Sequence, residues 1–189
     1  MNNNCELIDG EFYVLETIRF KLPQGPWWHS ADLEHDTIPG TTFRTWVDDP
    51  LDDEIEVATI IIADATSDPS EPDVSQLKDI SGSDLHDFLH EELVEETHSM
   101  GTEFIEWHGS KLLDTGGMSQ MLVTNFAIVD QGRNRQTTQI RKRIGSKNFV
   151  IMATVDTDRD DGFDIRVIDA IFNVAEINTS DRSNKSSVN

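Results

Sequence analysis

The stretch that decides the fold is MSQMLVTNFAIVDQGRNRQTTQIRKRIGSKNFVIMATVD, residues 118–156. Apolar and polar residues alternate in three segments of it, Met118 to Val129, Asn134 to Ile144 and Asn148 to Asp156, and this is the period of a half-buried β-strand. The separators Gln131-Gly132 and Gly145-Ser146-Lys147 have the length and composition of hairpin turns. The stretch therefore predicts an antiparallel meander.

Further strands are predicted upstream of this meander. Phe12 to Leu22 alternates like one or two short strands and is ended by the breaker cluster Pro23-Gln24-Gly25-Pro26. Thr42 to Val47 is a short strand, and Glu56 to Ala63 is rich in β-branched residues, which is typical of a central strand. Thr102 to Trp107 supplies the strand just before the meander.

Two segments change to the helical period. Asp84 to Glu96 is predicted to be an amphipathic helix, and a second helix is expected between Phe163 and Val174. Asp64 to Gly82 is predicted to be a loop, and Trp107-His108-Gly109-Ser110 a turn. The apolar stripe of the first helix consists of Leu85, Phe88, Leu89 and Leu93.

Because a sheet built from these strands has two faces to cover, we predict an α+β fold with an antiparallel β-sheet sandwiched by helices. The length of 189 residues suits one domain. We expect a single globular α/β domain over residues 1–178. Residues 179–189 have almost no apolar content and are predicted to be a disordered C-terminal tail.

The composition excludes several classes of function. The chain has 15 Lys and Arg against 36 Asp and Glu, a net charge of −21, so nonspecific binding to nucleic acid or to an anionic membrane is disfavoured. The longest apolar stretch, around Val57 to Ala63, is too short to span a bilayer, and the N-terminus lacks the regions of a signal peptide. We therefore predict a cytoplasmic protein without membrane insertion. One cysteine, Cys5, excludes an intramolecular disulfide.

The charge is polarised along the chain. Residues 31–96 carry twenty acidic and two basic side chains, whereas residues 131–148 carry six basic and no acidic ones. Four arginines of the second segment have odd numbers, so a two-residue period places them on one face of a strand. The residues of these two regions that we predict to bind a partner are Asp84, Asp87, Glu91, Glu92, Glu95, Glu96, Arg133, Arg135, Arg141 and Arg143.

Each charged region has two interpretations. The arginines either offer a surface for an anionic group or are neutralised within the chain by the acidic helix. The acidic region either captures a cationic partner, such as a basic toxin or nuclease, through electrostatic steering, or reflects adaptation to a saline habitat.

Candidate metal ligands do not complete a known motif. His86 and His90 have zinc-chelating spacing on the predicted helix, but Asp87 stands where an HExxH motif has its glutamate. The acidic loop from Asp156 to Asp161 resembles a calcium loop, yet Asp161 and Val167 occupy the positions that an EF-hand gives to glycine and glutamate. We find no catalytic motif, and we predict a chain that is not an enzyme and has no metal or cofactor. The alternative is a metal-dependent or small-ligand-binding protein.

Three stretches together resemble the PsbP-like fold: FKLPQGPWW (20–28), FIEWHGSKLLDTGGMSQMLVTNFAIV (104–129) and FVIMATVDTDRDDGFDIRVIDAIFNV (149–174). They are similar to the Pro-Gly-Trp opening, the W-x-G hairpin and the closing strand and helix of that fold, and cover roughly Phe12 to Ile177. The fold is shared by the photosystem subunit PsbP, a Ran-binding import factor and chaperones of type VI secretion effectors. The resemblance implies a PsbP-like α/β/α sandwich without shared catalytic residues.

Together, the resemblance and the charge map predict a non-enzymatic, acidic protein-binding domain of the adaptor, chaperone or immunity type. Its expected partner is a cationic protein. The alternative functions are those named above, namely metal or small-ligand binding, or a salt-adapted domain.

Overall fold

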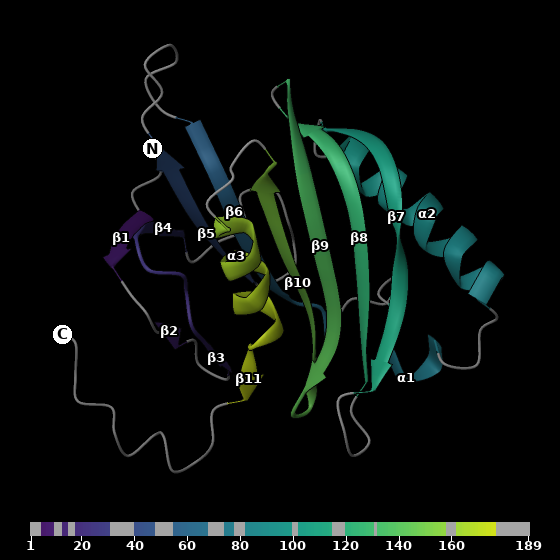
Figure 1. Ribbon diagram of the computed structural model, residues 1–189. Coiled ribbons are helices and arrows are strands. Elements are labelled where there is room, and N and C mark those ends of the chain that lie inside the picture. Colours follow the sequence, from purple (N-terminus) through teal and green to yellow (C-terminus); the bar gives the residue numbers. More distant parts are fainter. Residues whose placement is uncertain are drawn as a thin grey trace.

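The computed structural model describes residues 5–9, 13–14, 18–30, 40–47, 55–67, 74–77, 82–99, 102–114, 120–130, 132–157 and 162–176. Its main feature is an eight-stranded sheet in which every neighbouring pair is antiparallel (Figure 1). In order across the sheet, the strands are β1 (Cys5–Asp9), β4 (Pro26–Ser30), β5 (Gly40–Val47), β6 (Ile55–Asp64), β10 (Lys147–Asp156), β9 (Arg133–Ile144), β8 (Gln120–Asp130) and β7 (Glu103–Asp114).

The predicted meander is confirmed. Strands β8, β9 and β10 follow one another as hairpins, with Gly132 at φ 78° and Gly145 at φ 62° in the two tight turns. These positive φ angles are the reason that the turns carry glycine. Strand β6 pairs with β5 on one side and β10 on the other, so the β-branched segment is central, as predicted.

Strand β7 is longer than predicted, and the turn predicted at Trp107-His108-Gly109-Ser110 is wrong. The strand continues through these residues with two bulges, because Ile105 and His108 have no partner in the register with β8. Gly109 adopts φ 124° beside the second bulge. A glycine beside a bulge gives the same local sequence signal as a glycine in a turn, which explains the error.

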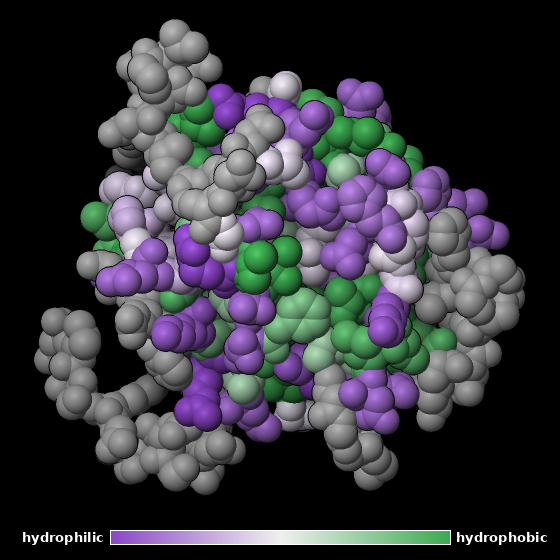
Figure 2. Space-filling view, in the orientation of Figure 1, coloured by the Kyte–Doolittle hydropathy of each residue, from purple (hydrophilic) through white to green (hydrophobic). Residues whose placement is uncertain are grey.

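The larger core lies on one side of the sheet, beneath α3 (Phe163–Phe172). Val167 and Ile171 of α3 pack in one cluster with Ile151 of β10 and Ile60 of β6. A small three-stranded sheet of β11 (Ala175–Glu176), β3 (Ile18–Phe20) and β2 (Tyr13–Val14) adds Ile18 and Phe20 to this cluster. We call this the α3 side of the sheet. Figure 2 shows hydrophilic and hydrophobic residues interspersed over it.

The opposite side carries α2 (Gly82–Ser99) and the short helix α1 (Val74–Leu77). Leu89 and Leu93 of α2 are fully buried against Leu122 and Phe126 of β8, and these two residues point away from α3 because they alternate with Val123 of the larger core. We call this the α2 side. Phe88, predicted to belong to the buried stripe, is instead 45% exposed.

Helices therefore lie on both faces of the sheet, but the predicted sandwich is only partial. Helix α2 contacts β7 and α3 contacts mainly β10, so each described helix covers a different part of its face (Figure 1). The predicted loop from 64 to 82 also contains α1, whose Val74 and Leu77 are buried. The predicted tail, 179–189, lies outside the described residues. None of the described helices is long and apolar enough to cross a membrane.

A buried histidine in β4 gives the fold a predicted sensitivity to acid. His29 is 8% exposed, and burial lowers its pKa below the usual 6.5, against a smaller opposing effect of Glu6. Its Nε2 lies 2.6 Å from Thr41 Oγ1, which itself donates to the carbonyl of Ser30, so His29 is the donor.

Because the unfolded chain binds a proton at His29 more readily than the folded chain, stability should fall as the pH decreases from 6.5 toward the lower folded-state pKa. We expect His29→Gln, which keeps an N–H donor, to flatten this dependence. Urea unfolding of both proteins at a series of pH values measures the effect. Parallel curves for the two proteins would contradict it.

Candidate functional site

The α2 side of the sheet carries the arginines that the sequence analysis singled out. The register pairs Arg135 with Ile128 and Arg141 with Leu122, and these partners face α2. Arg133, Arg135, Thr137, Gln139 and Arg141 alternate along β9 and share this side, as the odd-number spacing predicted. The side chains of Arg135 and Arg141 are each only 3% exposed.

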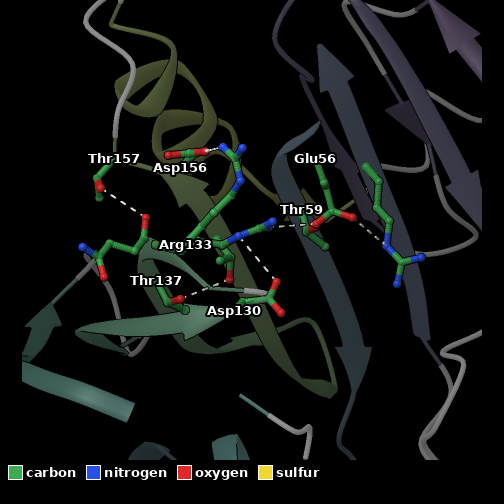
Figure 3. A network of polar contacts seen from close by, with 11 residues as sticks. Glu56, Thr59, Asp130, Arg133, Thr137, Asp156 and Thr157 are labelled. Atoms are coloured by element: carbon green, nitrogen blue, oxygen red, sulfur yellow. Dashed lines mark hydrogen bonds and ion pairs between the residues drawn. The ribbon is translucent and has the colours of Figure 1, made fainter. Parts of the chain in front are cut away.

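Each of the three arginines Arg133, Arg135 and Arg141 lies beside a carboxylate of this chain. Figure 3 shows three of these carboxylates, Asp156 of β10, Asp130 of β8 and, one strand further away, Glu56 of β6. Arg133 Nη1 lies 3.2 Å from Asp156 Oδ2 of β10. Arg135 Nη1 lies 3.0 Å from Glu56 Oε1 of β6, and its Nε lies 3.4 Å from Asp130 Oδ2 of β8. The strand arginines are thus neutralised largely by strand carboxylates.

Glu56 reaches Arg135 because of a bulge in β6. The register passes from Thr45 opposite Ala58 to Trp46 opposite Glu56, which leaves Val57 without a partner. The extra residue turns Glu56 to the same side as Thr59, whose hydroxyl donates to the Glu56 carboxylate. A second arginine, Arg44 of β5, lies with its Nε 3.6 Å from Glu56 Oε2.

Helix α2 is attached to the sheet by charge as well as by its leucines. Arg141 Nη2 donates to Glu92 Oε1 at 3.0 Å, and the Glu92 side chain is 26% exposed. His90, on the same helix, packs with its ring 5.4 Å from that of Phe104 and 6.0 Å from that of Trp107. The interpretation that the acidic helix neutralises an arginine internally is therefore confirmed for Arg141.

The outer face of α2 remains acidic. Asp87, Glu91 and Glu95 are exposed and follow one another at intervals of four residues, so they form one row along the helix. Phe88 and Val94 lie on either side of this row by helical geometry and are 45% and 39% exposed. The helix contains no lysine or arginine. We call these five residues the α2 outer face.

The ten residues predicted to bind a partner are thus divided between surface and interior. Arg135 and Arg141 are buried in ion pairs, and Arg133 and Glu92 are half-buried in them. The side chains of Asp84 and Glu96 lie outside the described residues. The predicted residues that are exposed are Asp87, Glu91, Glu95 and Arg143.

Sequence reasoning missed three carboxylates and two apolar side chains of this side. Glu56 and Asp130 pair with Arg135 across 79 and 5 residues of sequence, and the sequence pattern places Asp156 in a candidate calcium loop. Because β8 and β10 flank β9, the alternation of side chains along these strands could have placed Asp130 and Asp156 on the side of the arginines. No local signal indicates the bulge that turns Glu56 to that side. Helical periodicity does not identify which side of a helix is covered, so it could not show that Phe88 and Val94 are exposed.

The candidate metal ligands are not brought together among the described residues. No group of three or more described His, Cys, Asp or Glu residues could hold a metal ion. His90 packs against aromatic rings, and the side chain of His86 is not described. Asp156 is 5% exposed and paired with Arg133, and residues 158–161 of the acidic loop lie outside the described part of the chain.

Comparison with known proteins gives matches only among solved structures. No protein-family model and no curated protein matches the chain. The chain is similar to CyanoP, the cyanobacterial PsbP of Synechocystis sp. PCC 6803, with a TM-score of 0.55 and 14% identity over 90% of this chain and 94% of that chain. Protein PA94 of Pseudomonas aeruginosa, of unknown function, has a TM-score of 0.40 and 14% identity over 82% of this chain and 85% of that one.

A protein of Bacteroides thetaiotaomicron has a TM-score of 0.44 and 13% identity over 92% of this chain and 50% of that one. Of these three structures, CyanoP has the only TM-score above 0.5. At such low identity, the likeness concerns the fold alone. The eight-stranded antiparallel sheet with helices α2 and α3 is a PsbP-like fold, as the resemblance of the three sequence stretches predicted.

Proposed function

We propose that this chain is a non-enzymatic protein-binding domain, of the adaptor, chaperone or immunity type, that holds a cationic protein partner on the α2 outer face. The observation that carries the proposal is the contrast between the two faces of α2. On the inner face, Glu92 is neutralised by Arg141. On the outer face, Glu91 and Glu95 have no ion-pair partner among the described residues.

The energetics of the helix support this proposal. Carboxylates four residues apart on a helix repel one another by a few tenths of a kcal/mol, about 0.2–0.5 per pair. A helix that served only to cover the sheet would be more stable if a lysine stood among the carboxylates of the outer row, because opposite charges four residues apart attract. A cationic partner would relieve the repulsion, and a net charge of −21 would steer that partner toward the surface.

The exposed apolar residues support a protein partner rather than a free metal ion. Phe88 and Val94 are 45% and 39% exposed beside the acidic row. Interfaces typically join an apolar contact to a charged rim, and charged rims chiefly raise the rate of association. A cationic protein surface whose basic residues are flanked by apolar ones fits this arrangement.

The proposal can be tested with an oligolysine peptide followed by NMR of backbone amides. We expect the peptide to shift the amides of α2. The variant Glu91→Lys/Glu95→Lys turns two attractive surface charge contacts, each worth up to about 1 kcal/mol, into repulsive ones. Its affinity for the peptide should therefore fall about tenfold.

The matched control is Asp169→Lys/Glu176→Lys. It changes the net charge by the same amount, but at two exposed residues of α3 and β11 on the opposite side of the sheet. The control should retain affinity to within about twofold at moderate salt, because screened distant charges contribute little. An equal loss of affinity in both variants would show that only net charge matters, and would contradict a docking face on α2.

A further inference from the structure

A second feature of the α2 side lies at the other end of the sheet, where two tryptophans meet. Trp28 of β4 is 40% exposed, and its ring centroid lies 6.4 Å from that of Trp46 of β5, with 72° between the ring planes. Trp28 is opposite Arg44 in the register, and Arg44 is opposite Thr59, which faces the α2 side. Trp46 follows Arg44 by two residues on the same strand and so shares this side.

The two rings form a corner in which Trp28 is exposed and Trp46 is half-buried, here called the Trp28–Trp46 corner. Among the described residues, no lysine or arginine lies over either ring, and the cation–ring contact that the structure shows is Arg166 over Phe163 at 5.6 Å. The neighbouring Arg44 is held in another direction, with its Nε 3.6 Å from Glu56 Oε2. The faces of the two rings therefore carry no described cation, although Arg44 lies directly opposite Trp28 in the register.

The electrostatics of the corner favour a cation. The face of an indole carries the negative part of the ring quadrupole and is the aromatic surface that cations prefer. Arg44, opposite Trp28, and Arg135, which shares Glu56 with it, are balanced by Glu56 and Asp130, so they add no net positive charge. The chain as a whole is strongly negative. Pairs and cages of aromatic rings bind ammonium groups in this way.

The position of the corner relates it to the α2 outer face. Strand β4 is five places from β8 in the sheet order, which corresponds to roughly 24 Å at about 4.8 Å per strand. Both features lie on the same side of the sheet. The distance between them matches the size of a small protein rather than that of one amino acid. One folded partner can therefore contact both.

We propose that the Trp28–Trp46 corner binds the cationic head of a basic side chain of the partner, through cation–π contact with the Trp28 ring. The proposal rests on the proposed function in that the basic side chain belongs to the same cationic protein. Its contact is chemically different from the carboxylate contacts of α2, so the two can be tested separately.

The test uses tetramethylammonium, a cation that cannot donate a hydrogen bond, and tert-butanol, a neutral molecule of similar shape. NMR of the indole N–H groups in the full chain follows both titrations. We expect tetramethylammonium to shift the Trp28 and Trp46 signals in a saturable manner and to leave buried Trp27 unchanged. The response to tert-butanol should be at least several-fold smaller.

Two variants complete the test. Trp28→Leu keeps an apolar side chain and should abolish the saturable shift at Trp46, whereas Glu91→Lys/Glu95→Lys should leave the response to tetramethylammonium intact. No saturable shift, equal shifts with both molecules, or a shift at Trp46 that persists in Trp28→Leu would overturn the inference. None of these results would bear on the α2 outer face, because the oligolysine titration tests that face alone.

Discussion

Replacing Arg135 with alanine should lower the free energy of unfolding by about 3 kcal/mol. The arginine side chain is 3% exposed and lies between Glu56 and Asp130, so its removal leaves two carboxylates without their common partner. Loss of one member of a buried ion pair costs about 3–5 kcal/mol. We expect the lower end of this range, because the Glu56 and Asp130 side chains retain 24% and 26% exposure. Urea unfolding measures the change.

The matched control for Arg135→Ala is Arg143→Ala on the same strand. Arg143 is exposed, and its Nε donates to the nearby carbonyl of Gly145 at 3.4 Å, its one hydrogen bond within the described part of the chain. This variant should change the free energy of unfolding by about 0.5 kcal/mol or less. If the two variants have equal stability, Arg135 is not an internal structural residue, and the division between buried and surface arginines is wrong.

The second large effect is expected for Leu93→Ala in α2. Leu93 is fully buried against Phe126 and Ile128, and truncation of a buried leucine costs about 2–5 kcal/mol. Because α2 has only Leu89 as a further described, fully buried leucine, the loss should fall on the attachment of the helix. We expect hydrogen exchange of the α2 amides to accelerate while that of β6 and β10 changes less.

Val94→Ala is the control for this substitution, since it shortens the next residue of the same helix. Val94 is 39% exposed, so its truncation should change stability by about 0.5 kcal/mol or less. A uniform acceleration of exchange across the helix and the central strands in Leu93→Ala would instead show that α2 unfolds only with the whole domain.

The periodic parts of the fold could be predicted because they depend on local patterns. Alternation identified β6 and the meander of β8, β9 and β10, and glycines that adopt positive φ marked its turns. Helical spacing identified α2 and α3. The same alternation placed the arginines of β9 on one side of the sheet, which the register confirms.

The rest of the site depends on contacts that no local pattern encodes. The bulge at Val57 determines that Glu56 meets Arg135, and the two residues are separated by 79 positions in the chain. Bulges in β7 disguised a strand as a turn. The sequence indicated that Phe88 belongs to an apolar stripe, but only the packing of Leu89 and Leu93 shows which flank of that stripe remains in water.

The most direct test of the account is to purify the chain from its native source and measure its mass by size-exclusion chromatography with light scattering. The unchanged chain and both double lysine variants are compared at low and high salt, with mass spectrometry of any companion. The account predicts a stoichiometric basic protein at low salt that is lost at high salt and lost in Glu91→Lys/Glu95→Lys, but kept in Asp169→Lys/Glu176→Lys. A monomer at both salt concentrations, or a companion that Glu91→Lys/Glu95→Lys retains, would contradict it.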